Sequence, residues 1–291
     1  MATSTDAVTS FSLDEQALLI ACQGEQMVGI LSRPATPTTL DVAVLVVAGG
    51  PQYRVGSHRQ FALLARRLAG AGVPVLRFDC RGMGDSDGEM RNFEQIEADV
   101  GAALDALAAA CPRARRLVVW GLCDAASAAL MFCTSDKRVA GLVLANPWVR
   151  SEASLARAHL KHYYPGRVLQ RDFWLKVLSG RFDWRRALSA LLGTLRSRSR
   201  PEADPGAKLS FQQRMAAGWN RFQGRILLVI SGDDLTANEF LEAARQAPLW
   251  QGLLAHSKVE RFDLPEANHT FATAAWRQSV EERTLRWVRA L

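Results

Sequence analysis

The residues with the clearest chemical potential lie in the segment WGLCDA, residues 120–125, which joins a predicted strand to a predicted helix. A nucleophile at such a tight turn has a strained backbone, so small residues must stand two positions before and after it. Gly121 and Ala125 fill these two places around Cys123. The N–H groups at the start of a helix favour a thiolate and can hold an oxyanion. The pattern therefore predicts a cysteine nucleophile, with a small buried cysteine as the structural alternative.

Asp124 is the other candidate nucleophile in this segment. Making it the nucleophile would place Leu122 where a small residue is required, so this alternative fails. The carboxylate of Asp124 would oppose ionisation of the thiol if it faced the sulfur. Its backbone N–H is instead expected to serve as a donor in the oxyanion hole.

Two later segments carry the acid and the base that such a nucleophile needs. Asp233 and Asp234 follow a predicted strand over residues 226–230, and His269 follows a predicted strand over residues 259–264. Open α/β sheets place their ligand sites at the carboxyl ends of the strands, so these side chains are expected to meet there. The chain order of nucleophile, acid and histidine is one that catalytic triads are known to adopt.

The segment AGGPQ, residues 48–52, follows a buried strand and is expected to supply the second oxyanion-hole donor. Pro51 has no N–H, so Gly50 is the first choice and Gln52 the second. A plain turn is the alternative interpretation of this segment.

A structural loop is predicted in RFDCRGMGDS, residues 77–86, because its glycines permit backbone angles that other residues avoid. We expect Asp79 and Arg81 to pair and fix this loop.

Strand-like and helix-like segments alternate along most of the chain, which predicts an α/β fold with a mostly parallel, eight-stranded sheet and flanking helices. The predicted strands are a hairpin over 16–32 and the segments 42–47, 73–78, 117–120, 139–145, 226–230 and 259–264. The predicted helices are 59–69, 93–110, 125–133 and 274–290. The alternation stops over residues 150–220, which we interpret as a helical insertion into a core made of residues 1–149 and 221–291.

The net charge of +7 is concentrated in one part of the 291-residue chain. Residues 150–225 hold about sixteen Lys and Arg against about five Asp and Glu. Such asymmetry can indicate contact with acidic ligands or surfaces, and a solvated helical face is the plainer interpretation. No stretch of about 18 uninterrupted apolar residues is present, so no transmembrane segment is predicted.

Taken together, these motifs resemble the α/β-hydrolase superfamily over essentially the whole chain. More narrowly, GGPQYRVGSHRQF, RFDCRGMGDSDG, WGLCDAASAAL and NPWVR resemble hydrolase 1 of the exosortase A system-associated family, which is encoded alongside bacterial exopolysaccharide biosynthesis genes. The resemblance implies that Cys123 is the nucleophile, His269 the base and Asp234, rather than Asp233, the acid. It also implies a sheet in which the 42–47 strand lies between the 73–78 and 117–120 strands.

The chain departs from the superfamily at two places. Cys123 replaces the usual serine, and Ala48 replaces the usual histidine of the oxyanion loop. A thiol nucleophile suits activated acyl groups such as lactones and thioesters, and a Cys-His-Asp triad on this fold resembles that of dienelactone hydrolase. The resemblance places the basic insertion over the strand ends as a cap. His58 and Trp148 are candidate substrate contacts.

The leading interpretation is hydrolysis of an ester, lactone or thioester by an acyl-cysteine route. An acyltransferase would share the first half-reaction, and a catalytically inert hydrolase-fold protein that binds a partner through its basic cap is the third hypothesis. We expect a small-molecule or glycosylated acyl substrate, with no cofactor, no metal and no nucleic acid. Five cysteines without metal-ligand spacing favour a reducing compartment, so a cytoplasmic location is expected. No oligomeric state is predicted.

Overall fold

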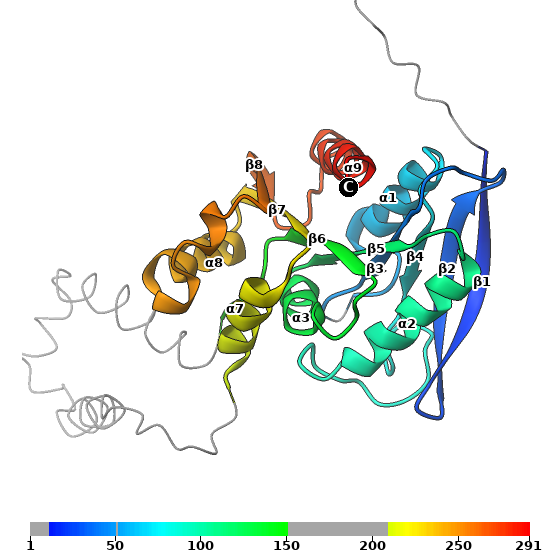
Figure 1. Cartoon of the computed structure of the whole chain (residues 1–291), viewed down its shortest axis with the longest axis horizontal. Helices are drawn as coiled ribbons and strands as arrows, with labels where there is room; N and C mark the ends of the chain where they lie inside the picture. Colours follow the sequence, from blue (N-terminus) through cyan, green and yellow to red (C-terminus); the bar gives the residue numbers. More distant parts are fainter. Residues whose placement is uncertain (1–11, 51, 151–208) are drawn as a thin grey trace, which may run out of the picture. The chain divides into compact units, whose positions relative to one another are not determined.

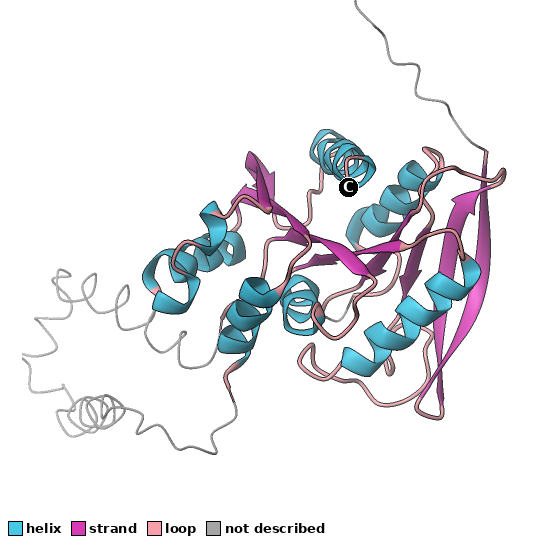
Figure 2. Ribbon diagram, in the orientation of Figure 1, coloured by secondary structure: helices cyan, strands magenta, loops and turns pink. Residues whose placement is uncertain are grey.

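The central element is one twisted β-sheet in the computed structural model, which describes residues 12–50, 52–150 and 209–291. Eight strands of the described residues form it in the order β1-β2-β4-β3-β5-β6-β7-β8 (Figures 1 and 2). The strands are β1 (Leu13–Cys22), β2 (Glu25–Pro34), β3 (Val42–Val47), β4 (Val75–Phe78), β5 (Arg116–Leu122), β6 (Val139–Ala145), β7 (Arg225–Asp233) and β8 (Val259–Asn268). β1 and β2 pair antiparallel with each other, β2 pairs antiparallel with β4, and the remaining pairs are parallel. The predicted fold class is confirmed, and β3 lies between β4 and β5 as expected.

Helices cover both faces of this sheet, as Figure 1 shows. The α-helices of the described residues are α1 (Gln60–Ala69), α2 (Glu97–Ala110), α3 (Asp124–Phe132), α7 (Phe211–Arg221), α8 (Leu235–Gln246) and α9 (Ala274–Arg289). Residues of α1 and α9 share one hydrophobic cluster with one face of the sheet, and residues of α2, α3, α7 and α8 share another with the opposite face. Val44 of β3 belongs to the first cluster and its neighbour Leu45 to the second. Strands covered on both faces need apolar side chains throughout, which explains the uninterrupted run in β3.

The chain divides into a core unit, Met1–Val149 with Ser210–Leu291, and a second unit, Arg150–Leu209. The predicted cap insertion therefore falls mainly in the second unit, and most of it lies outside the described residues. Its C-terminal end forms α7, which belongs to the core unit and packs against α3. Contact is close because Gly218 has no side chain: a Cβ there would lie 1.7 Å from the backbone oxygen of Leu130. Gln212 Nε2 donates a hydrogen bond to Val149 O at 3.1 Å. The start of α7 therefore lies beside the last residue of the first stretch of the core unit.

Within the part of the chain that the structure describes, no helix combines the length and the apolar character needed to cross a bilayer.

The loop after β4 is held by several ion pairs, but not by the pair that the sequence suggested. Asp79 accepts hydrogen bonds from the backbone N–H of Arg54, at 2.6 Å, and from the Arg54 guanidinium. Arg81 instead pairs with Asp99 of α2, with Arg81 Nε 2.6 Å from Asp99 Oδ1. The expected Asp79–Arg81 pair is therefore wrong. Both carboxylates are fully buried, so each needs a charged partner close by, and folding brings those partners from other elements.

A polar network at the edge of the sheet joins β1 to its neighbours through Glu15. Its carboxylate accepts hydrogen bonds from Arg66 of α1 at 2.6 Å, from Ser32 of β2 at 2.8 Å and from Arg77 of β4 at 3.1 Å. Burial alone would raise the pKa of Glu15, but the hydrogen bonds from Arg66, Ser32 and Arg77 outweigh it and lower this pKa to about 2.

Replacing Glu15 with glutamine is expected to destabilise the protein at pH 7 but much less at low pH. The folded-state pKa lies below the ordinary value of 4.5, so the stabilisation is complete above pH 4.5 and is lost as the pH falls towards 2. We expect a loss of about 1 kcal/mol at pH 7, after allowance for solvent screening. Urea unfolding of wild type and Glu15→Gln at a series of pH values measures the difference in their free energies of unfolding. The exposed Glu89 is the control, and a difference that stays constant with pH would contradict the assignment.

Candidate active site

Cys123 lies at the turn between β5 and α3 in a backbone conformation that few side chains adopt. Its φ is 62° and its ψ is −124°. Such strain persists only where the surroundings fix it, and hydrogen bonds of the Cys123 backbone do so here. The Cys123 N–H donates to Ala145 O at 2.9 Å, and Cys123 O accepts from the N–H groups of Ala126 at 3.1 Å and Trp148 at 3.2 Å. The side chain is partly exposed.

The small residues around Cys123 are required by close backbone packing. A Cβ on Gly121 would lie 2.6–2.7 Å from backbone atoms of Ala125 and Ala126. Ala125 is completely buried, which leaves little room for a longer side chain. The spacing argument from the sequence thus has a direct steric basis in this turn.

His269 and Asp234 lie side by side at the carboxyl ends of neighbouring strands. His269 Nδ1 is 2.8 Å from Asp234 Oδ2. Asp234 is also the N-cap of α8 and accepts hydrogen bonds from the backbone N–H groups of Thr236, at 3.1 Å, and Ala237, at 3.2 Å. These bonds fix the carboxylate in place, whereas Asp233 is exposed. Of the two adjacent aspartates, Asp234 is the one that contacts the histidine.

The pKa of His269 is raised to about 10, first by its hydrogen bond with Asp234 and then by one with Cys123. Burial of the half-buried ring acts in the opposite direction but is the weaker effect. The three side chains therefore form a continuous chain of contacts from Cys123 through His269 to Asp234. At neutral pH the raised pKa keeps the His269 ring in its imidazolium form.

The remaining cysteines are poor candidates for nucleophilic chemistry. All five cysteines are free thiols. Burial raises the pKa of Cys22, Cys80, Cys111 and Cys133, in the last of these to about 12. A thiol with a raised pKa holds little thiolate at neutral pH, so none of these four competes as a nucleophile.

Asn146 supports the site, although the sequence analysis gave it no role. It follows β6 and is completely buried. Its Nδ2 donates to Ser231 Oγ at 2.9 Å and to His269 O at 3.1 Å, and its Oδ1 accepts from the Ser231 N–H at 2.8 Å. One amide therefore joins the ends of β6 and β7 to the backbone of His269. An Asn-Pro pair directly after a buried strand is the signal that could have found it.

Two of the predicted oxyanion-hole donors, the N–H groups of Gly50 and Gln52, already donate hydrogen bonds within the protein. The Gly50 N–H donates to Asp124 Oδ2 at 2.8 Å. The N–H of Gln52 donates to Gly49 O at 3.3 Å and closes the turn of the oxyanion loop. Gly50 therefore contacts the residue that directly follows Cys123, whereas Gln52 bonds within its own loop.

The two candidate substrate contacts differ in position. Trp148 lies beside the turn, because its N–H donates to Cys123 O, and its side chain is half-buried. His58 has an exposed side chain and a left-handed backbone, with φ 53°. Its local geometry provides no contact with Cys123, His269 or Asp234 in the described residues.

A cavity of about 330 Å³ adjoins the oxyanion loop. Its polar walls include Gly50 and Asp124, and most of the remaining wall is apolar. The apolar residues that line it are Ala48, Cys80, Met83, Met90, Phe93, Ile96 and Ala125. Ligand sites of enzymes commonly have about 300–1,000 Å³ and mostly apolar walls, so this cavity is large enough for a small substrate group.

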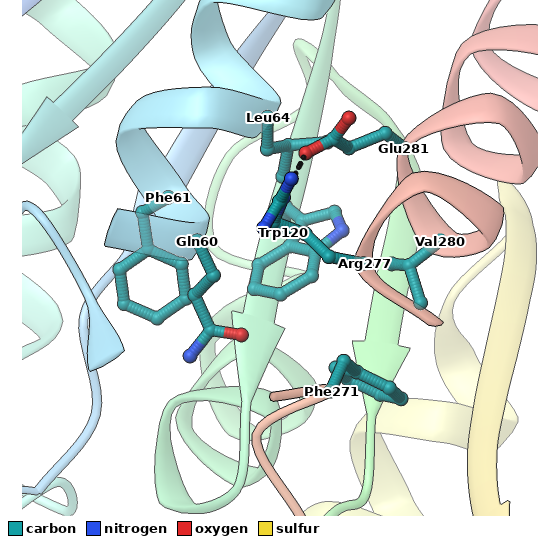
Figure 3. A pocket seen from close by; sticks show the side chains of 8 residues that line it. All are labelled: Gln60, Phe61, Leu64, Trp120, Phe271, Arg277, Val280 and Glu281. Atoms are coloured by element: carbon teal, nitrogen blue, oxygen red, sulfur yellow. Dashed lines mark hydrogen bonds and ion pairs between the residues drawn. The ribbon is translucent and has the colours of Figure 1, made fainter. Parts of the chain in front are cut away.

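A second void lies between α1, β5 and α9, as Figure 3 shows, and it has only about 10 Å³. Arg277 and Glu281 pair across one helical turn at its edge, at 3.1 Å, and Gln60 and Trp120 face it from the other elements. This volume admits at most a single water molecule. Within the described residues, no group of three His, Cys, Asp or Glu side chains is arranged to hold a metal ion.

Solved structures with a similar fold include three hydrolases. The esterase Pf2001 of Pyrococcus furiosus is 16% identical, with a TM-score of 0.63 and coverage of 96% of this chain and 93% of that chain. Dienelactone hydrolase from Anabaena variabilis is 14% identical, with a TM-score of 0.61 and coverage of 96% and 98%. Est1E from Butyrivibrio proteoclasticus, with ferulic acid bound, is 16% identical, with a TM-score of 0.59 and coverage of 93% and 98%. No curated protein sequence matches the chain. At such identities these likenesses establish the fold alone.

Sequence similarity to a family model extends over most of the chain. The model of the alpha/beta hydrolase family matches residues 44–282, from β3 into α9. This range contains the turn at Cys123 and the ends of β7 and β8 that carry Asp234 and His269. The chain therefore belongs to the alpha/beta hydrolase family.

Proposed function

We propose that the protein hydrolyses an activated acyl bond, in an ester, lactone or thioester, with Cys123 as nucleophile, His269 as base and Asp234 as the acid that orients it. The observation that carries the proposal is the contact of His269 Nδ1 with Asp234 Oδ2 at 2.8 Å, and Cys123 is a further cause of the raised pKa of this ring. A base that is oriented by a carboxylate and touches a nucleophile is the geometry of nucleophilic catalysis. The esterase and the dienelactone hydrolase among the similar structures support this class of reaction.

In the first half-reaction, the Cys123 thiolate attacks the carbonyl carbon and a C–S bond forms. The carbonyl π electrons move to oxygen, and the resulting oxyanion needs backbone N–H donors. We assign these donors to Gly50 and Asp124. When the intermediate collapses, the bond to the leaving group breaks and the leaving group takes a proton from His269, whose raised pKa keeps it protonated until then.

In the second half-reaction, neutral His269 removes a proton from water, and the hydroxide oxygen attacks the acyl-cysteine. The C–S bond breaks, the carboxylic acid leaves, and Cys123 returns as a thiolate beside a protonated His269. Replacing water with an alcohol acceptor would turn the same intermediate into acyl transfer, so the acceptor decides between hydrolase and transferase.

The biological setting is a further part of the proposal. The narrow motif resemblance to hydrolase 1 of the exosortase A system-associated family supports a cytoplasmic role in bacterial exopolysaccharide biosynthesis. A glycosylated acyl compound would then be the natural substrate, with the basic cap insertion contributing to its recognition. The acyl bond, rather than the sugar, is the part that the proposed site attacks.

The proposal is tested by mixing the protein with p-nitrophenyl acetate or an acetyl thioester and recording the intact mass. We expect one acetyl group on Cys123, located by peptide mapping, and its loss over time in water. Cys123→Ala is expected to form no adduct and to release p-nitrophenol at the background rate. Adding a sugar acceptor separates transfer from hydrolysis.

The matched control is Cys111→Ala, because Cys111 is a half-buried thiol away from the site. This variant should acylate like wild type. Acylation at a residue other than Cys123, or turnover by Cys123→Ala equal to that of wild type, would contradict the proposed mechanism.

A further inference from the structure

The carboxylate of Asp124 lies where the proposed reaction needs an oxyanion. Asp124 is the first residue of α3 and directly follows Cys123. Its Oδ2 accepts the Gly50 N–H at 2.8 Å, and backbone N–H groups of Ala125 and of Asp124 itself also stabilise its charge. The Gly50 N–H, one of the two donors assigned to the substrate oxyanion, is thus already engaged by this side chain.

The fit of this carboxylate is close on its other side. A Cβ on Gly49 would lie 2.1 Å from Asp124 Oδ1 and 2.7 Å from Leu122 O. Only glycine therefore allows the oxyanion loop to rest against the carboxylate, whose Oδ1 is buried. Burial raises the pKa of Asp124, while the N–H of Gly50 acts against this change.

A carboxylate and an oxyanion cannot share this place. The Gly50 N–H can donate well to one oxygen only, and two negative charges at hydrogen-bond distance from the same donor repel each other. The proposed reaction can therefore proceed through Gly50 only after the Asp124 carboxylate has moved. The cavity of about 330 Å³ is lined by both residues and gives the side chain space to turn into.

We propose that Asp124 is a positioning residue that controls the oxyanion hole: its carboxylate and the substrate oxyanion compete for the Gly50 N–H. This inference rests on the proposed function. In the resting protein the carboxylate holds the oxyanion loop against α3, and during acylation it yields its place to the substrate. A strongly activated acyl group, such as a thioester, can displace the carboxylate from the Gly50 N–H more readily than an unactivated ester.

Removing the Asp124 carboxylate tests the competition, because a competing carboxylate and a merely structural one predict opposite changes in kcat for acylation. Asp124→Ala is expected to raise kcat for acylation by p-nitrophenyl acetate about tenfold, with little change in KM, because a hydrogen bond to a charged group is worth roughly one to two powers of ten in an equilibrium constant. The same variant should unfold at a lower temperature, because it loses a negative charge at a helix N-terminus. A merely structural role would lower both stability and kcat.

Asp124→Asn provides a second measurement should the alanine variant fold poorly. Its amide oxygen can still accept the Gly50 N–H but carries no charge, so a smaller rise of about threefold is expected. Glu97→Ala is the matched control, since Glu97 is the acidic first residue of α2. It should lose stability in the same way and leave kcat unchanged.

The pH dependence gives a readout that a structural role would not produce. As the pH falls through the raised pKa of Asp124, the wild-type carboxyl becomes neutral and releases Gly50 more easily. The ratio of the Asp124→Ala rate to the wild-type rate should therefore shrink towards one at acidic pH. A ratio of one or less at neutral pH, or a rise that does not vary with pH, would overturn the inference.

Failure of this inference is distinguishable from failure of the proposed function. Absence of any Cys123 adduct in wild type removes both. A normal wild-type adduct, together with slower acylation in both Asp124 variants, removes only the role of Asp124.

Discussion

Replacing Asp234 with asparagine is expected to lower the rate of Cys123 acylation about 10³-fold while leaving the fold intact. The loss is set somewhat below the 10⁴-fold effect in serine triads, because a thiol needs less help than a hydroxyl. Asparagine cannot stabilise the imidazolium, so the pKa of His269 should fall from about 10 towards its ordinary value of 6.5. Its amide can also donate to Nδ1, which favours the tautomer that cannot serve as base at Cys123.

The fold should survive because asparagine is as good an N-cap as aspartate. The hydrogen bond from the Thr236 N–H to Oδ1 can therefore be kept, whereas the one from the Ala237 N–H to Oδ2 is lost when the amide NH2 takes that place. Single-turnover acylation and an NMR titration of His269 measure the two effects. Asp233→Asn is the control, since this neighbour is exposed. A large loss in the Asp233 variant with none in the Asp234 variant would reverse the assignment.

Replacing Gly121 with alanine is expected to damage both stability and chemistry. The added Cβ would lie 2.6–2.7 Å from backbone atoms of the first turn of α3, which cannot move aside as a flexible side chain could. We expect a loss of about 3 kcal/mol in the free energy of unfolding. Cys123 would also shift relative to His269, and a displacement of about 1 Å can cost roughly 10²-fold in rate.

Gly101→Ala is a closely matched control for this variant. Gly101 lies inside α2, and a Cβ there would meet nothing within 4 Å. It should stabilise the protein by about 0.5–1 kcal/mol, because alanine is the better helix former. Denaturant unfolding measures the stability of the two variants, and single-turnover kinetics measure their acylation rates. If both glycine variants were equally stable, the turn at Cys123 would not be as tight as its packing indicates.

The strands could be predicted well because their signal is local. β3 and β6 begin and end at the predicted residues, since each is an uninterrupted apolar run. α8, over Leu235–Gln246, is not among the predicted helices. The apolar spacing of Ala237, Phe240 and Leu241, after the N-cap Asp234, contained the helix signal.

The contacts within the site could be predicted only in part. Chain order and strand ends brought Asp234 and His269 together correctly, because parallel strands end at one edge of the sheet. The partners of Asp79 and Arg81 come from other elements, and no local pattern identifies them. The hydrogen bond from Gly50 to Asp124 depends on how closely two loops approach, which is decided by packing around Gly49.

The hydrogen bond between Gln212 and Val149 bears on how much the length of the chain between these two residues can vary. The first stretch of the core unit ends at Val149, which lies next to Gln212 in the second stretch, so a polypeptide that joins the two has only a short distance to span. Loop-closure entropy changes slowly with length, so longer or shorter replacements cost little. We therefore expect segments of different length to be accepted between these two residues while Cys123, Asp234 and His269 stay in place. Chimaeras joined at these two residues, with their unfolding midpoints compared with that of wild type, measure this tolerance.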